Sequence, residues 1–108
     1  MTDPAARPDL SVGRSVIVET ARLAALEVPE VLRVDRSGPR WRALLAGPPV
    51  MVRVRADEVN VRIRIIARPG ADLVATAARV RTAVAAAVER LLGLRVGEVT
   101  VLVDGVGG

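Results

Sequence analysis

Residues 50–65 alternate between aliphatic and polar side chains, and this alternation constrains the fold more than any other part of the sequence. Valine or isoleucine takes every second position on either side of Asp57, and arginine fills most of the positions between them. A period of two is that of a β-strand, because successive side chains of a strand point to opposite faces. The stretch therefore predicts a β-hairpin with one face in the core and an arginine-rich face in water.

Keeping the aliphatic side chains on one face predicts a pairing register for this hairpin. We expect Val54 opposite Val61 and Arg53 opposite Arg62, with the same register continuing along both strands and a turn around Asp57 and Glu58. A like-charge pair across two strands is unfavourable by up to about 1 kcal/mol. The pair would therefore need a nearby carboxylate or an anionic partner.

Two interpretations of the arginine face stay open. It is either a solvated face, balanced by acidic residues of other strands, or a binding face for phosphate, anionic lipid or an acidic protein. The candidate partner-binding residues are Arg33, Arg53, Arg55, Arg62, Arg64 and Trp41. Trp41, the sole aromatic residue, could anchor a partner beside Leu44 and Leu45, or its ring could cover one end of the core.

Composition argues against an enzyme. The chain has 108 residues and a net charge of +4, and it contains no histidine, cysteine, lysine or tyrosine. Its serines and threonines therefore lack a nitrogen base to activate them, and only carboxylates could do acid–base work. No acidic spacing points to a metal site, and we expect no cofactor. A modest positive charge does not by itself imply nucleic-acid binding.

The order of the predicted elements indicates an α+β fold. We expect a helix capped by Ser11 or Ser15 and running to about Val28, a strand over 31–36, the hairpin, a helix over 73–92 between Asp72 and Gly93, and a strand over 95–104. Residues 41–46 fit a short strand or an irregular stretch. The expected fold is a small two-layer sandwich, with two helices on one face of a three- to four-stranded, mainly antiparallel sheet.

The expected organisation is one domain over residues 11–106, with a flexible tail over 1–10 and a flexible end over 107–108. The chain opens without an apolar signal segment, and no apolar run is long enough to span a bilayer. We therefore expect a cytoplasmic location, either free or as a peripheral protein at the inner face of the membrane.

Three stretches carry a family resemblance: residues 15–31, 59–73 and 80–106. The third is the most specific, with a helix, Gly93-Leu94, and an alternating valine strand closed by Gly105-Val106. In this order and spacing the chain resembles the alkaline-shock-protein family, the envelope-stress-response proteins of Gram-positive bacteria. It departs from the family at Glu30, where a glycine is usual, and at Pro69, where an aromatic residue is common.

The resemblance implies a non-catalytic cytoplasmic protein that self-associates or docks to a membrane-anchored protein and is linked to cell-envelope homeostasis. The leading hypothesis is therefore an interaction or scaffold module that binds a protein partner at the cytoplasmic side of the membrane. The alternative is a nucleic-acid-binding module that uses the arginine face, although that face offers no aromatic side chains for stacking on bases. A third possibility is peripheral attachment to anionic lipid through the same arginines.

Overall fold

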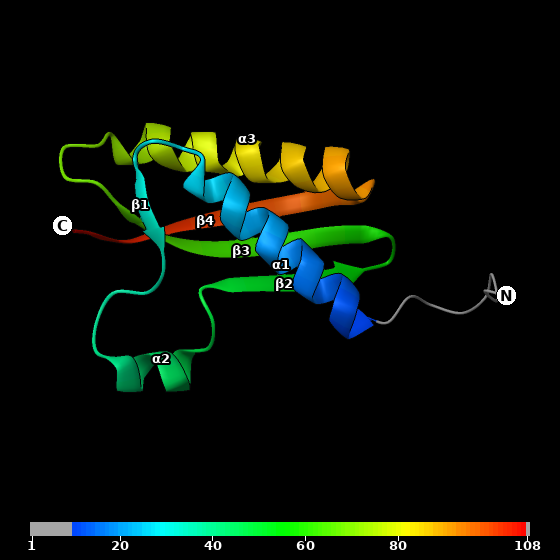
Figure 1. Cartoon of the computed structure of the whole chain (residues 1–108), viewed down its shortest axis with the longest axis horizontal. Coiled ribbons are helices and arrows are strands. Elements are labelled where there is room, and N and C mark those ends of the chain that lie inside the picture. Colours follow the sequence, from blue (N-terminus) through cyan, green and yellow to red (C-terminus); the bar gives the residue numbers. More distant parts are fainter. Residues whose placement is uncertain (1–9, 108) are drawn as a thin grey trace, which may run out of the picture.

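The computed structural model describes residues 10–107, which form three helices and a four-stranded sheet (Figure 1). In chain order the elements are α1 (Leu10–Leu26), β1 (Val31–Val34), α2 (Arg40–Ala46), β2 (Val50–Arg55), β3 (Glu58–Ala67), α3 (Leu73–Leu92) and β4 (Arg95–Val106). The tail predicted for residues 1–10 lies outside the described residues except for Leu10, with which α1 begins. Of the end predicted over residues 107–108, only Gly107 is described.

The central strand of the sheet is β3. Its first half pairs with β2 and its last residues pair with β1, both antiparallel, so β1 and β2 follow one another along the same edge of β3. Along its other edge β3 pairs in parallel with β4. The parallel pair follows from the chain order, because α3 connects the end of β3 to the start of β4 as a crossover helix.

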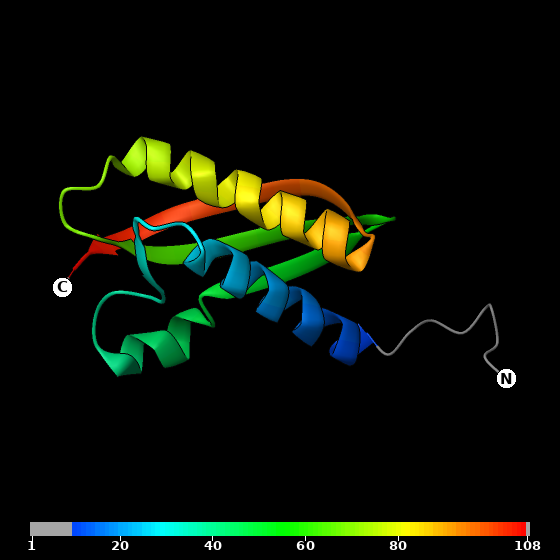
Figure 2. The same cartoon turned by 45° about the horizontal axis from the view of Figure 1, so that its top comes forward.

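Both long helices cover the same face of the sheet, and the opposite face carries no helix (Figures 1 and 2). The core lies between the two layers and is almost wholly aliphatic. Its most deeply buried large side chains are Ile63 and Ile65 of β3 and Val80, Val84 and Val88 of α3. The predicted two-layer α+β sandwich, with two helices on one face of the sheet, is confirmed.

The predicted ends of α3 are confirmed. The Asp72 carboxylate accepts a hydrogen bond from the Ala75 N–H at 3.1 Å, which satisfies one of the free amides of the first turn. Gly93 ends the helix with a φ of 67°, a left-handed conformation that glycine adopts without steric cost. The i+3 and i+4 spacing of apolar residues also predicts a buried stripe from Leu73 to Leu91. The two ends of this stripe are wrong, because Leu73 and Leu91 are exposed and the buried side chains come from the middle of the helix.

The first helix departs from its prediction at both ends. α1 begins at Leu10, upstream of both predicted serine caps, and ends at Leu26, before Pro29. Its buried stripe contains Ile17, Ala21 and Ala24, as the spacing predicts. Small alanine side chains at this interface let the helix lie close to its neighbours.

The predicted register of the hairpin is wrong by two residues. Val54 pairs with Val59, and Arg53 pairs with Asn60, so the expected Arg53–Arg62 pair does not form. The reason is a tighter turn than expected, with only Ala56 and Asp57 between the paired strands and a left-handed φ of 54° at Ala56. Because a shift of two residues preserves the alternation, the predicted faces are otherwise unchanged, but Val54, expected in the core, is 47% exposed next to the turn.

Residues 40–46 form α2, which is neither the short strand nor the irregular stretch expected there. The Arg42 N–H donates to the Pro39 carbonyl at 3.0 Å in the first turn. The helix stands away from the two layers, beyond the sheet edge formed by β1 and β2 (Figures 1 and 2). The neighbouring strand β1 is shorter than predicted, because it ends at Val34 and the chain then turns toward α2.

Candidate functional site

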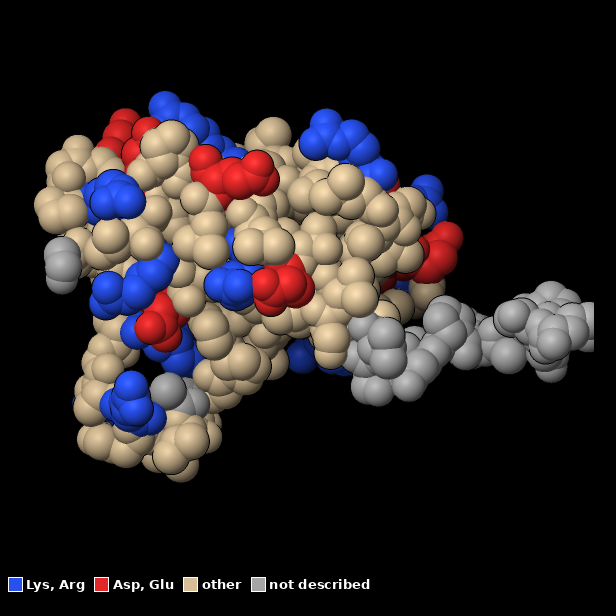
Figure 3. Space-filling model, in the orientation of Figure 1, with Lys and Arg blue, Asp and Glu red and all other residues tan. Residues whose placement is uncertain are grey.

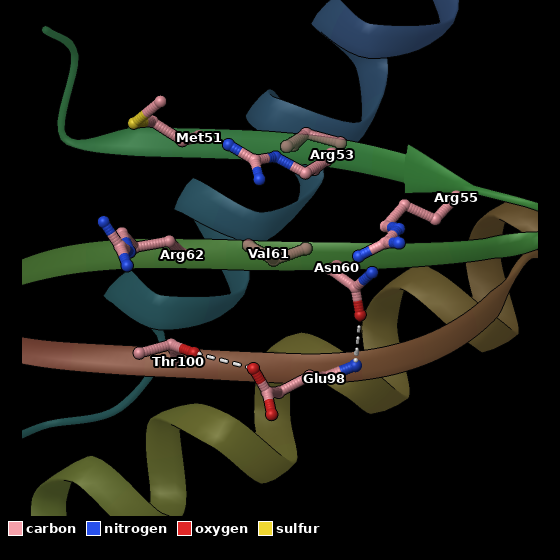
Figure 4. A pocket seen from close by; sticks show the side chains of 9 residues that line it. Met51, Arg53, Arg55, Asn60, Val61, Arg62, Glu98 and Thr100 are labelled. Carbon is pink, nitrogen blue, oxygen red and sulfur yellow. Dashed lines mark hydrogen bonds between the residues drawn. The ribbon is translucent and has the colours of Figure 1, made fainter.

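The face of the sheet without helices holds a shallow depression of about 270 Å³. Arg53 and Arg55 of β2 and Arg62 of β3 line it, together with Glu98 of β4 (Figure 4). The remaining lining residues are Met51, Val52, Asn60, Val61 and Thr100. The wet side of three neighbouring strands is therefore one continuous surface, which we call the open face.

Charge on the open face is unbalanced around this depression. Three guanidinium groups face one carboxylate, that of Glu98. Within residues 10–107, Arg53, Arg55 and Arg62 make no ion pair, while Glu98 accepts a hydrogen bond from the Thr100 hydroxyl at 3.4 Å. A guanidinium group binds a carboxylate or phosphate through two parallel hydrogen bonds. The depression thus suits an anionic group.

The register explains how these arginines come together without a direct clash. Arg62 lies opposite Met51 on β2 and Thr100 on β4, and Arg53 lies opposite Asn60. Arg53 and Arg62 therefore have neutral residues directly across the strand and are related to each other diagonally, whereas Arg55 lies opposite Glu58. Diagonal neighbours are farther apart than directly opposed ones, so their repulsion is weaker.

The other two predicted arginines lie away from this depression and are paired with acids. Arg64 Nη1 lies 3.1 Å from Asp104 Oδ1, in a pair whose side chains are each 24% exposed. Arg33 on β1 lies 3.8 Å from the Asp35 carboxylate. Each of these two arginines therefore has an acidic neighbour and lies outside the depression.

Asp104 connects the sheet to the segment before α2. Its Oδ2 accepts from the Ser37 N–H at 2.7 Å, and its Oδ1 accepts from Arg64. The Ser37 amide contributes most to lowering the pKa of Asp104 below its ordinary value, burial opposes the shift, and the charge of Arg64 reinforces it. The carboxylate is thus held ionised where β4 meets the loop.

A bulge in β4 shapes the other end of the depression. Val59 pairs with Val96 but Val61 pairs with Val99, so β4 contains an extra residue beside Asn60. The Asn60 Oδ1 accepts from the Glu98 N–H at 2.8 Å (Figure 4), and a Cβ added at Gly97 would lie 2.7 Å from the same oxygen. Glycine at position 97 therefore makes room for the side chain that closes the bulge.

Sequence reasoning missed the roles of Asn60, Gly97 and Glu98. A glycine inside a strand of alternating valines is a known signal for a bulge or a close approach, and Gly97 was such a signal. Asn60 was also the one amide among the arginines of the hairpin. Together they would have pointed to the place where β3 and β4 lose their regular pairing.

Trp41 does not lie on the open face, and its ring does not cover the core. It is on α2 with 59% of its surface exposed, and Leu44 and Leu45 beside it are 87% and 82% exposed. The Arg42 guanidinium lies over the indole ring, 5.4 Å from its centroid. The structure thus separates the predicted site residues into two surfaces, the open face and the apolar side of α2.

The described part of the chain offers neither a metal site nor a membrane span. In residues 10–107 no three acidic side chains gather in a way that could hold a metal ion. None of the three helices combines the length and the apolar character needed to cross a membrane.

Two solved structures resemble this fold, and both are mutants of the MamM CTD described as zinc forms. The first is 19% identical to the chain, covers 87% of each chain and has a TM-score of 0.57. The second is also 19% identical, covers 87% of this chain and 84% of the other, and has a TM-score of 0.53. At this identity the likeness shows the fold alone. No curated protein matches the chain.

A sequence family matches nearly the whole chain. The profile of this family matches residues 3–107, and the family is described as having a cell envelope-related function. The match agrees with the α+β fold and with the resemblance carried by the opening helix, the hairpin and the closing valine strand. The chain belongs to the alkaline-shock-protein (ASP23) family.

Proposed function

We propose that this protein is a non-catalytic interaction module of the cell envelope that binds an acidic segment of a protein partner on its open face. The observation that carries the proposal is the depression lined by Arg53, Arg55 and Arg62, whose guanidinium groups have no acidic partner within the described residues. An unpaired cluster of like charges gains most from an anionic ligand. The partner acts at the cytoplasmic side of the membrane, in keeping with the envelope-related family.

An acidic protein segment fits this surface better than a nucleic acid does. Single-stranded nucleic acids are usually held by aromatic side chains that stack on bases. The only aromatic residue of the chain is Trp41, which is on α2 and does not line the depression. Carboxylates, in contrast, need only the guanidinium groups that the open face provides.

Charge reversal on the open face tests this function. The tagged protein is first used to capture partners from its native cells, with chemical crosslinking and mass spectrometry to identify them. We expect Arg53→Glu/Arg62→Glu to weaken capture of the identified partner by at least about tenfold, which corresponds to about 1.4 kcal/mol. Both side chains are exposed, so the variant should fold.

The matched control is Arg22→Glu/Arg90→Glu, which makes the same change in net charge on the two long helices α1 and α3, away from the open face. It should capture the partner as the wild type does. Equal loss in both variants would show that only overall charge matters, and capture unchanged by Arg53→Glu/Arg62→Glu would rule out the open face. Binding of single-stranded nucleic acid that falls steeply with salt would instead favour the nucleic-acid alternative.

Self-association is part of the same proposal. Among the described strands β4 pairs only with β3, so the backbone along its outer edge has no strand partner. An unpaired edge can accept a strand from a second copy. Homo-oligomers would present several open faces to a partner and increase its apparent affinity.

A further inference from the structure

We infer that α2 inserts its apolar side into the headgroup region of a membrane containing anionic lipid, a contact separate from the protein-binding surface proposed above. The feature behind it is an exposed group of three large side chains, Trp41, Leu44 and Leu45, on a helix that stands away from the rest of the protein (Figure 1). A surface of this kind on a small domain marks an interaction site.

The spacing places these three side chains on one side of the helix. At 100° per residue, Trp41, Leu44 and Leu45 span an arc of about 100°. Arg40 lies at one border of that arc and Arg42 at the other. An apolar arc with a basic residue at each border is typical of helices that lie in the plane of a membrane interface, with the apolar side down and the cations level with the lipid phosphates.

The chemistry of the residues favours lipid over a protein groove as the occupant. Tryptophan prefers the membrane–water interface, where its ring is among the acyl chains and its N–H remains near polar groups. Residues 33–42 contain four arginines, Arg33, Arg36, Arg40 and Arg42, against one acid, Asp35. This local excess of positive charge is complementary to the anionic surface of a cytoplasmic leaflet.

The loop that carries α2 is held at its base and leaves the helix projecting. Arg36 Nε donates to the Gly47 carbonyl at 2.6 Å. This hydrogen bond joins the residue segment before α2 to the segment after it. The Ser37 N–H donates to Asp104 at 2.7 Å and fastens the same base to the end of β4. Figure 3 shows the result as a projection at the lower left, whose surface is mostly uncharged and carries basic side chains. Such a fixed projection loses little conformational entropy when it enters a membrane.

The experiment uses Trp41 as its own reporter, because no other aromatic residue contributes to fluorescence. The full chain is mixed with vesicles of phosphatidylglycerol and phosphatidylcholine, or of phosphatidylcholine alone. We expect co-flotation and a shift of tryptophan emission to shorter wavelength with the anionic vesicles, and much weaker effects with the neutral ones. Raising the salt concentration should reduce both effects.

Substitutions on α2 identify the contact. Leu44→Ser/Leu45→Ser should weaken partition into the anionic vesicles at least about tenfold, and Arg40→Glu/Arg42→Glu should do so to a similar extent. The control Val74→Ser/Leu91→Ser removes two apolar side chains of α3 that are also largely exposed, and it should float as the wild type does. These positions are all exposed, and circular dichroism checks that each variant is folded.

Three results would overturn the inference: no emission shift with anionic vesicles at low salt, flotation unchanged in Leu44→Ser/Leu45→Ser, or flotation lost only in Arg53→Glu/Arg62→Glu. The first would leave a protein as the occupant of this side of α2. The third would assign lipid binding to the open face. Partner capture and vesicle binding depend on different variants, so either proposal can fail while the other holds.

Discussion

Two polar side chains, Asn60 of β3 and Asp104 of β4, hold the irregular ends of the β3–β4 pairing that borders the open face. At one end Asp104 binds the Ser37 amide and the Arg64 guanidinium, and at the other Asn60 fills the space above Gly97. Both lie where the pairing between β3 and β4 shifts register. Bulges leave backbone groups without strand partners, and Asn60 satisfies one of them, the Glu98 N–H, while Asp104 binds the loop and Arg64.

The lowered pKa of Asp104 makes part of the stability depend on pH. Because the folded pKa lies below the unfolded value of about 3.9, the ionised carboxylate stabilises the fold above about pH 4, and this contribution is lost as the pH falls through the folded pKa. Asp104→Asn should lower the free energy of unfolding at pH 7 by about 1.5 kcal/mol.

Denaturant unfolding measured from pH 7 to pH 2 checks this effect. The difference between wild type and Asp104→Asn should shrink below about pH 4, because the wild-type carboxyl is then protonated as well. Asp57→Asn serves as the control, since that side chain is 78% exposed in its pair with Arg95 and should change little. A constant difference at all pH values would contradict the role given to the ionised form.

At the scale of the elements, replacing glycine by alanine should lower the free energy of unfolding at position 97 of β4 and raise it at position 13 of α1. Gly97→Ala would place a methyl group 2.7 Å from the Asn60 Oδ1, so the side chain must leave the Glu98 amide. We expect a loss of about 1–2 kcal/mol in the free energy of unfolding. Gly13→Ala in α1 meets no atom within 4 Å and should raise it by about 0.5–1 kcal/mol, because alanine favours a helix.

Thermal unfolding of both variants provides the measurement. A loss of stability in Gly97→Ala together with a gain in Gly13→Ala would separate the steric effect at the bulge from the general effect of adding a methyl group. Equal small gains at both positions would mean that Asn60 moves aside without cost and that the bulge does not depend on its hydrogen bond.

The elements with strong periodicity could be predicted from the sequence, and the connections between them could not. Both faces of the hairpin and both ends of α3 follow from spacing and from the caps at Asp72 and Gly93. The register of the hairpin was missed because Ala56, a residue that rarely adopts a positive φ, takes part in a two-residue turn.

The helix α2 was missed although a signal for it was present. Trp41, Leu44 and Leu45 have helical spacing, and Pro39 precedes them where helices often begin. The short length of the segment hid the period, and no core contact selected it. The arginines of the open face were identified as one surface, but only the structure distinguishes those paired with acids from those left unpaired.

For the whole molecule, the layered arrangement gives three separate surfaces. The helices cover one face of the sheet, the open face is available to a partner, and α2 projects beyond one edge (Figures 1 and 2). The outer edge of β4 lies across the sheet from the edge formed by β1 and β2. A copy added at β4 would therefore leave α2 and the open face accessible.

Light scattering over a concentration series tests the proposed self-association. We expect the molar mass to rise above the 11.4 kDa of one chain as the concentration increases. The same series with Arg53→Glu/Arg62→Glu should give the same masses, because the open face is separate from the β4 edge. A single monomer mass throughout would count against self-association.

The position of β3 also has a consequence for biosynthesis. During translation β1, β2 and β3 can pair as soon as they have left the ribosome, but the parallel neighbour of β3 follows only after all of α3. In that interval one side of β3 exposes free amides and aliphatic side chains, the features that chaperones bind on nascent polypeptides. Completion of the strand–helix–strand unit ends this vulnerable stage.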